Sequence, residues 1–204
     1  MGSFDQVRLI ESFDETHALF DLINPPPQLY VRGEHLDLLL GKDTVAIVGS
    51  RDVSLESIAV AKEYARTCAE QGIVVVSGLA NGIDSAAFEG ALSADGICIA
   101  VLPSPVDNVV PSGNIELAKS ILKKGGCIIS EYDSGVKLKK WMFLHRNRII
   151  AAISKKVVIG EARKGGGAWN TIEHAWKMNR PTFSLSNSGE LNQISNPQRG
   201  LFDE

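Results

Sequence analysis

The stretch TVAIVGSR at residues 44–51 joins a continuously apolar run, 45–48, to a glycine, a serine and an arginine. A strand whose side chains are apolar on both faces is typical of a parallel sheet that helices cover on both sides. Five further runs follow the same pattern, at residues 73–77, 97–102, 127–130, 156–160 and 181–185. The sequence therefore predicts an α/β fold: a Rossmann-like open, mostly parallel sheet with helices on both faces.

Amphipathic stretches lie between these runs and predict the helices. The clearest begins after Ser54, a residue suited to the N-cap, and places its apolar side chains on one face. The predicted helices span residues 55–71, 84–94, 114–124, 146–154 and 168–178. We expect residues 1–43 to form an N-terminal arm with a short strand-like run at 29–31, residues 44–187 to form the core domain, and residues 188–204 to form a polar, partly disordered tail.

Length and composition indicate one ordinary globular domain. The chain has 204 residues, of which 44% are hydrophobic, and a chain of this length can bury a core without disulfides or metals. Its longest apolar runs fall far short of the roughly 20 residues that a membrane span requires, and residues 1–5 show no targeting signal. We therefore expect a cytoplasmic protein with no membrane partner. The three cysteines are expected to be reduced core thiols, because their spacing fits neither a CxxC pair nor a metal site, and neither a metal nor a cofactor is predicted.

The charge of the chain is unevenly distributed. Its 21 basic and 24 acidic residues give a formal net charge of −3, which by itself argues against a polyanionic partner. Residues 119–164, however, hold 12 basic and 3 acidic side chains, a net charge of +9, whereas residues 1–44, 45–118 and 165–204 carry −5, −6 and −1. One basic block in an acidic chain predicts a localised anion site.

The loops that follow the strands are the expected place for a ligand, because open parallel sheets bind ligands at the carboxyl ends of their strands. In the first loop, the amides of Gly49 and Ser50, the serine hydroxyl and the guanidinium of Arg51 suit phosphate oxygens. A plain turn with an exposed arginine explains these residues equally well. A GxGxxG motif is absent from this loop, which disfavours an ordinary NAD enzyme.

The second loop is compact and opens a helix. Ser77, Gly78 and Gly82 give it the small residues of a tight turn, and Asp84 is the expected N-cap of the helix that follows. As structure alone this loop needs no ligand. We include its serine and glycines among the candidate phosphate contacts because they lie at the same predicted edge of the sheet.

The loop before the fifth strand carries the strongest polar signal. Arg146, Asn147 and Arg148 open a predicted helix whose N-terminus already favours anions, so cations placed there indicate a bound anion. The alternative is an ion pair, and we expect at least one of the two arginines to pair with Glu131 or Glu161. Glu161 is also the one plausible general base, so its role as a catalytic residue or as the partner of an arginine stays open.

Two further segments add charge and allow close backbone approach. Lys140, beside Trp141 and after two other lysines, combines charge with a stacking surface, as in proteins that bind single-stranded nucleic acid. Lys164 and the glycine run 165–167 precede Thr171 and a helix, where backbone amides can approach phosphate; a flexible hinge is the alternative. No Ser-His-Asp order and no metal-ligand spacing is evident, and the sequence favours a binding protein over an enzyme.

Together these loops resemble the DNA-processing protein A family, also called DprA or Smf. The resemblance covers residues 28–185 and rests on six motifs in register: VAIVGSR at 45–51, VSGLA with GID at 76–84, IAVL at 99–102, ISEY at 129–132, RNRII at 146–150, and EA at 161–162 followed by Thr171. It implies an extended Rossmann fold, a homodimer, single-stranded DNA bound in a basic pocket, and partnership with the RecA recombinase during natural transformation. The family is not established as enzymatic.

Some positions depart from the family's pattern. Asn81 stands where the family usually has an arginine, Phe88 where it usually has a histidine, and Leu144 where it usually has a proline. The run GGGAW at 165–169 replaces a Ser-Gly-Ser-like stretch. The missing arginine implies weaker or altered anion binding.

The loops and the resemblance predict a single-stranded DNA-binding protein that acts as a recombination mediator in DNA uptake and processing. The DNA- or phosphate-binding residues are expected to be Gly49, Ser50, Arg51, Ser77, Gly78, Gly82, Lys140, Arg146, Asn147, Arg148, Lys164, Gly165, Gly166, Gly167 and Thr171. One alternative is a nucleotide-binding phosphoribohydrolase similar to the LOG (lysine-decarboxylase-like) family, which the glycine run with Thr171 and Glu173 resembles and in which Glu161 is the candidate catalytic residue. The other is a non-catalytic nucleotide sensor that uses the first loop.

Overall fold

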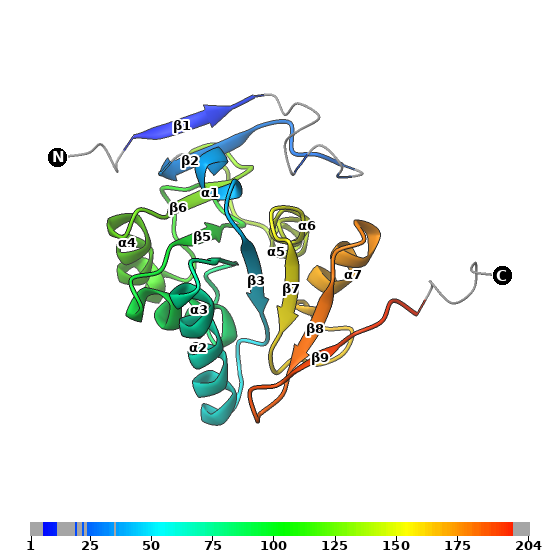
Figure 1. The fold of residues 1–204 in the computed structure, drawn as a ribbon. Helices are drawn as coiled ribbons and strands as arrows, with labels where there is room; N and C mark the ends of the chain where they lie inside the picture. Colours follow the sequence, from blue (N-terminus) through cyan, green and yellow to red (C-terminus); the bar gives the residue numbers. More distant parts are fainter. Residues whose placement is uncertain (1–5, 12–18, 20–21, 23, 35, 198–204) are drawn as a thin grey trace.

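The computed structural model describes residues 6–11, 19, 22, 24–34 and 36–197, which form one mixed sheet flanked by helices (Figure 1). The strands are β1 (Val7–Ile10), β2 (Leu29–Gly33), β3 (Thr44–Val48), β4 (Val74–Ser77), β5 (Cys98–Val101), β6 (Cys127–Ser130), β7 (Lys156–Ile159), β8 (Thr182–Leu185) and β9 (Leu191–Gln193). The helices are α1 (Leu36–Leu40), α2 (Leu55–Glu70), α3 (Ile83–Ser93), α4 (Ile115–Lys123), α5 (Lys140–His145), α6 (Asn147–Ala152) and α7 (Trp169–Lys177).

The strands follow the order β1-β2-β6-β5-β4-β3-β7-β8-β9. All neighbours from β6 to β8 are parallel, whereas β1 and β2 at one edge and β9 at the other pair antiparallel. The six apolar runs of the sequence form the six parallel strands, so the prediction of a Rossmann-like, mostly parallel sheet is confirmed. The chain passes from β3 to β4 on one side and returns to β7 on the other, which makes the gap between β3 and β7 the topological switch point.

Both faces of the parallel strands are covered. Every residue of β3 is buried, and its side chains alternate between two hydrophobic cores. Ala46 and Val48 pack in the core that contains side chains of α1, α6 and α7, whereas Val45 and Ile47 pack in the core beneath α2, α3 and α4. Double coverage explains why the sequence of this strand lacks polar alternation.

The described part of residues 1–43 is built into the sheet. The strand-like run predicted at 29–31 is β2, which pairs antiparallel with β6 and alternates between buried and half-buried residues. Its Leu29 and Val31 lie in the same core as Leu36 and Leu39 of α1. β1, which the sequence did not predict, covers the outer edge of β2. The boundary of the core domain at residue 44 stays a prediction, and residues 1–5 and 12–18 of the expected arm lie outside the described residues.

A strand also occurs in the segment that we expected to be a loop-like tail. β9 forms an antiparallel hairpin with β8, in which the amide of Ser186 donates to the carbonyl of Glu190 at 2.9 Å. The polar sequence of β9 gives no strand signal, because this edge strand is held by backbone hydrogen bonds more than by buried side chains. The expected disorder of residues 198–204 concerns positions outside the described residues.

The helix predicted at 146–154 is α6, which spans only Asn147–Ala152, and a second short helix that the sequence did not predict, α5, precedes it. α5 begins at Lys140, within a lysine-rich segment that we interpreted as a loop, and Arg146 lies at its junction with α6. The prediction of reduced core thiols is confirmed, since Cys68, Cys98 and Cys127 are free and buried. None of the helices in the described part of the chain is both long enough and apolar enough to cross a membrane.

Candidate functional site

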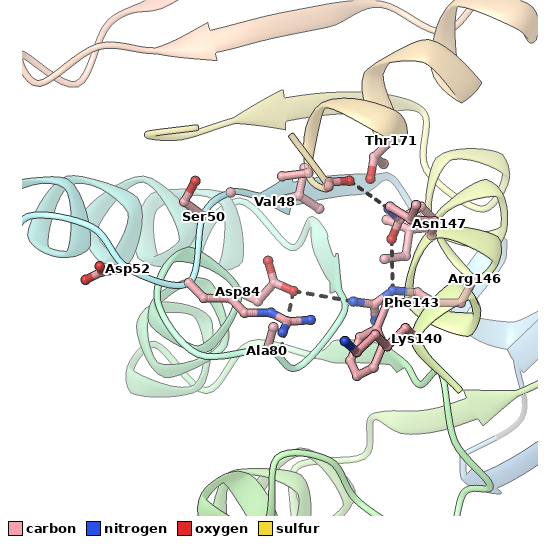
Figure 2. A pocket seen from close by; sticks show the side chains of 16 residues that line it. Val48, Ser50, Asp52, Ala80, Asp84, Lys140, Phe143, Arg146, Asn147 and Thr171 are labelled. Carbon is pink, nitrogen blue, oxygen red and sulfur yellow. Dashed lines mark hydrogen bonds and ion pairs between the residues drawn. The ribbon is translucent and has the colours of Figure 1, made fainter. Parts of the chain in front are cut away.

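A pocket of about 650 Å³ opens at the switch point, beyond the carboxyl end of β3 (Figure 2). Its walls come from the first loop, the start of α3, helices α5 and α6, and the start of α7. Eight of the predicted site residues line it: Gly49, Ser50, Arg51, Lys140, Arg146, Asn147, Gly167 and Thr171. The remaining predicted residues, Ser77, Gly78, Gly82, Arg148, Lys164, Gly165 and Gly166, do not.

Arg146 forms the inner wall of the pocket and is only 5% exposed. Its Nη1 donates to the carbonyl oxygen of Gly78 at 2.7 Å and to that of Val101, and its Nε donates to Oδ1 of Asn147 at 2.9 Å. Its Nη2 lies 3.9 Å from Oδ2 of Asp84 (Figure 2). Burial lowers the pKa of Arg146 to about 10. Because most of its donors are engaged by the protein, Arg146 supplies a fixed positive charge rather than a free fork for phosphate.

Asp84 is the buried counter-ion of Arg146. Its Oδ2 accepts the amides of Gly78 at 3.2 Å and Ala80 at 3.4 Å, and the residue is 4% exposed. The prediction that Asp84 caps its own helix is wrong: Gly82 is the N-cap of α3, and the loop after β4 folds back so that its amides reach the carboxylate. Burial raises the pKa of Asp84, and the nearby Arg146 opposes that rise.

The small residues of the second loop make room for Arg146. A Cβ at Gly78 would lie 2.0–2.1 Å from the guanidinium atoms of Arg146, so any larger residue displaces that side chain. Gly82 has φ +77°, and a Cβ there would meet the carbonyl oxygen of Ser50 at 2.3 Å. The hydroxyl of Ser77 is buried and donates to the carbonyl of Ile47 at 2.6 Å. These residues therefore shape the pocket without lining it.

Exposed cations lie at the mouth of the pocket. The Arg51 guanidinium lies over the ring of Phe143, 4.7 Å from its centroid, which is a cation–π arrangement. Lys140 is one turn before Phe143 on α5 and is also exposed. Phe143 and Asp52 line the pocket but were not among our candidates. The spacing of Lys140 and Phe143 by three residues was a usable signal for one helix face, had α5 been predicted.

The start of α7 closes the pocket on the side of β7. The Nδ2 of Asn147 donates to the carbonyl of Gly167 at 3.0 Å and so joins α6 to the glycine run. Thr171 is 1% exposed, and its Oγ1 has no hydrogen-bond partner within the described part of the chain. Lys164 lies elsewhere, in a second cavity of about 550 Å³ with Trp169 and Glu173.

Arg148 belongs to a buried polar cluster outside the pocket. Its Nη2 donates to Oε1 of Glu131 at 2.5 Å, which confirms that one arginine of the motif pairs with Glu131. Its Nε donates to Nε2 of His145 at 3.4 Å, and Nδ1 of that imidazole lies 3.0 Å from the hydroxyl of Tyr132 and 3.2 Å from Oε2 of Glu131. Burial and the charge of Arg148 lower the pKa of His145, in agreement with a neutral ring.

Glu161 holds the start of α2 rather than an arginine. Its Oε2 accepts the amide and the hydroxyl of Ser54, both at 3.1 Å, and hydrogen bonds from Ser57 and Ser54 lower the pKa of its carboxyl. The prediction that Glu161 fixes Arg146 or Arg148 is therefore wrong. It does not line the pocket, which leaves its suggested role as a general base without geometric support.

The +9 block of the sequence is spread over several surfaces. Of its 12 basic residues, Lys140 and Arg146 line the pocket. Others form surface ion pairs on α4 or near β7: Lys119 with Glu116, Lys124 with Asp95, and Lys155 with Asp43. The basic side chains that line the pocket are therefore Lys140, Arg146 and Arg51, of which Arg51 lies outside the block, and Asp52 and Asp84 line it as well. Within the described residues, no group of three or more His, Cys, Asp or Glu side chains could hold a metal ion.

Comparison with known proteins shows which family the sequence matches. Residues 9–199 match the family profile described as DNA recombination-mediator protein A. The chain is 35% identical to protein Smf of Synechocystis over 182 residues. The aligned region covers 88% of this chain and 46% of that protein. The chain spans about half the length of the curated relatives it matches.

Solved structures of similar proteins share the fold. DNA processing protein A from Streptococcus pneumoniae superimposes with a TM-score of 0.79 at 32% identity, over 98% of this chain and 67% of that one. DNA processing protein A from Helicobacter pylori, whose structure is described in terms of its single-stranded DNA binding mode, gives a TM-score of 0.79 at 32% identity, over 97% of this chain and 87% of that one.

Proposed function

The chain belongs to the DNA recombination-mediator protein A family, and from that premise we propose that its switch-point pocket binds single-stranded DNA in DNA processing and recombination. The observation that carries the proposal is the convergence on one pocket of three cations from two distant segments of the sequence. Arg51 comes from the loop after β3, and Lys140 and Arg146 come from the two ends of α5. The acidic remainder of the chain confines such binding to one face of the protein.

The three cations would have different tasks. Arg51 and Lys140 are exposed and would contact phosphate oxygens directly, whereas Arg146 would act through its fixed charge. Phe143 offers an aromatic ring to a base or sugar at the same mouth, provided that Arg51 leaves its face. The hydroxyl of Ser50 would complete the phosphate contacts, whereas the amides of Gly49 and Ser50, which the sequence suggested for this role, are bound to Asp84 and to the carbonyl of Glu161.

The salt dependence of binding measures the number of phosphate contacts. For single strands, the slope of log K against log salt is about −0.7 per neutralised phosphate, so two contacts through Arg51 and Lys140 predict a slope of about −1.4 for the pocket. The assay is fluorescence anisotropy with a labelled 20-nucleotide oligothymidylate, dT20, titrated between about 50 and 200 mM salt.

Lys140→Gln is the informative variant, and Lys119→Gln is its matched control. Both remove one exposed lysine, but Lys119 is on α4, pairs with Glu116 and does not line the pocket. We expect Lys140→Gln to weaken binding and to reduce the slope by about 0.7, with Lys119→Gln unchanged. Equal effects of the two substitutions would show non-specific attraction, and folded protein that binds no dT20 at low salt would overturn the proposal.

The resemblance to full-length family members also suggests partners for this chain. We propose that it acts with the RecA recombinase in the cytoplasm and assembles as a homodimer, because it belongs to this family. Analytical ultracentrifugation gives the oligomeric state directly. Co-sedimentation with RecA filaments on DNA, compared with DNA alone, tests the partnership; no enrichment by RecA would contradict it.

The size of the pocket also supports a nucleotide sensor, since about 650 Å³ falls within the range of small-molecule sites. The phosphoribohydrolase alternative has less support, because Glu173 lines the second cavity and Glu161 binds Ser54. AMP that displaces dT20 without release of adenine would favour the sensor, and release of adenine would favour the hydrolase.

A further inference from the structure

An exposed aromatic side chain lies directly beside the pocket. Trp141 is 52% exposed, on the same short helix that contributes Lys140 and Phe143 to the pocket wall. Leu144, also on α5, is 48% exposed and does line the pocket. Large apolar side chains with this exposure are uncommon on the described surface of this protein, and two of the six occur on one helix of six residues.

The order of side chains around α5 makes one continuous surface. At about 100° per residue, Phe143, Lys140, Leu144 and Trp141 follow one another around the helix, with steps of about 40° to 60°. Phe143, Lys140 and Leu144 face the pocket, and Trp141 comes next. A strand that leaves the pocket over Lys140 and Leu144 therefore meets the indole ring.

The indole is held in place although half of it is exposed. Its ring makes edge-to-face contacts with Tyr132, at a centroid distance of 6.2 Å, and with His145, at 5.4 Å. His145 is fixed in turn by the buried pair of Arg148 and Glu131. Because the ring is already ordered by these contacts, stacking on its exposed side loses less conformational entropy than stacking on a free side chain.

The charge around Trp141 matches a polyanion. Lys137 and Lys139 come from the segment just before α5 and, like Lys140, are exposed. No acidic side chain among the described residues forms an ion pair with these three lysines. Charge beside an exposed aromatic ring is the usual composition of a surface that binds single strands without sequence preference.

We propose that Trp141 and Leu144, with Lys137 and Lys139, form a second subsite for the bound strand, on which a base outside the pocket stacks. This inference rests on the proposed function, since it concerns the path of the same DNA. The subsite directs the DNA that leaves the pocket across α5 toward Tyr132. Longer oligonucleotides therefore make contacts that a dinucleotide in the pocket lacks.

The test compares ligand lengths in Trp141 variants. We expect Trp141→Ala to weaken the binding of dT20 about 5- to 150-fold and to leave the salt slope unchanged, because stacking releases no counterions. Trp141→Phe should retain most of the affinity. The 5′-phosphorylated thymidine dinucleotide should bind wild type and Trp141→Ala alike. Ile115→Ala, which removes an exposed apolar side chain from α4, is the control and should not change either affinity.

A second measurement does not depend on the alanine variant. Titration with dT20 should quench the intrinsic tryptophan fluorescence of wild type, and Trp141→Phe, which keeps Trp169 and Trp176, should lose most of that quenching. Unchanged quenching in Trp141→Phe, or an equal loss of dinucleotide and dT20 affinity in Trp141→Ala, would overturn the subsite. If Lys140→Gln weakens dT20 binding while Trp141→Ala does not, the subsite fails and the proposed function stands. If wild type binds no dT20, the proposed function itself fails.

Discussion

Replacing Arg146 by methionine should destabilise the protein strongly, because it removes the counter-ion of a buried carboxylate. Asp84 is 4% exposed and Arg146 is 5% exposed, with 3.9 Å between Nη2 and Oδ2. At an effective dielectric constant of about 20, two unit charges at this distance attract each other by about 4 kcal/mol. Removal of one partner from a buried pair costs about 3–5 kcal/mol, a large fraction of the 5–15 kcal/mol stability that is typical of a domain.

The coupling between the two side chains is measured by a double-mutant cycle. The variants are Arg146→Met, Asp84→Asn and the double substitution, and the assay is urea unfolding followed by circular dichroism at pH 7.5. Asparagine keeps an acceptor for the amides of Gly78 and Ala80 but removes the charge. We expect the double variant to be more stable than Arg146→Met, with a coupling energy of about 2–4 kcal/mol.

The pH dependence of the stability of Arg146→Met is a second, independent test of the ion pair. Burial raises the pKa of Asp84, and loss of the guanidinium removes the largest influence that opposes this rise, which leaves only the hydrogen bonds from Ala80, Ser77 and Gly49. A carboxyl whose pKa is higher in the folded than in the unfolded state binds more protons when folded, so this contribution makes the variant more stable as pH falls from 7.5 toward 5. A coupling energy below about 0.5 kcal/mol, or a penalty that grows on acidification, would refute the assignment of Asp84 and Arg146 as a buried ion pair.

Three further outcomes follow from other parts of the structure. Burial, with Lys177 nearby, lowers the pKa of His174 to about 4. The folded protein therefore binds fewer protons than the unfolded chain between about pH 4 and 6.5, and it loses stability as pH falls through that window, by at most about 2 kcal/mol at pH 5. His174→Gln should flatten the dependence of the urea midpoint on pH. Glu161→Ala should lower the melting temperature by loosening the start of α2 and leave dT20 affinity unchanged; a loss of affinity would instead return this carboxylate to the binding site. A water-soluble disulfide reagent should label the thiols only after unfolding, because burial raises the pKa of each, and rapid labelling in native buffer would contradict the buried positions of Cys68, Cys98 and Cys127.

The parallel core could be predicted from the sequence because most of its strands are apolar and buried on both faces. The runs that form β3 to β8 carry this signal within four to six residues, and the glycine and arginine after β3 mark the loop at the switch point. The edge strands could not be predicted in the same way. β1 and β9 are exposed or half-buried, and they are defined by backbone pairing with β2 and β8.

The pocket could be located from the sequence, but the separate roles of the two arginines in RNRII at 146–150 could not. Arg146 and Arg148 both lie at the start of the predicted helix, and both were candidate anion ligands, with at least one of them expected to form an ion pair. Their roles depend on groups far away in the chain: Arg146 binds carbonyls 68 and 45 residues away, and Arg148 binds a carboxylate 17 residues away. Burial of a cation is decided by such long-range partners, which local spacing does not reveal. The basic residues of the +9 block likewise lie on different surfaces of the folded protein, which their closeness in the sequence does not reveal.

Hydrogen exchange in the presence of dT20 tests the central claim most directly, because it locates the bound strand without altering any residue. We predict slower exchange at residues 49–52, which line the pocket, and at residues 140–147, which include α5, with α4 unchanged. Protection confined to α4 or to the edge strands, with the pocket segments unchanged, would contradict the account.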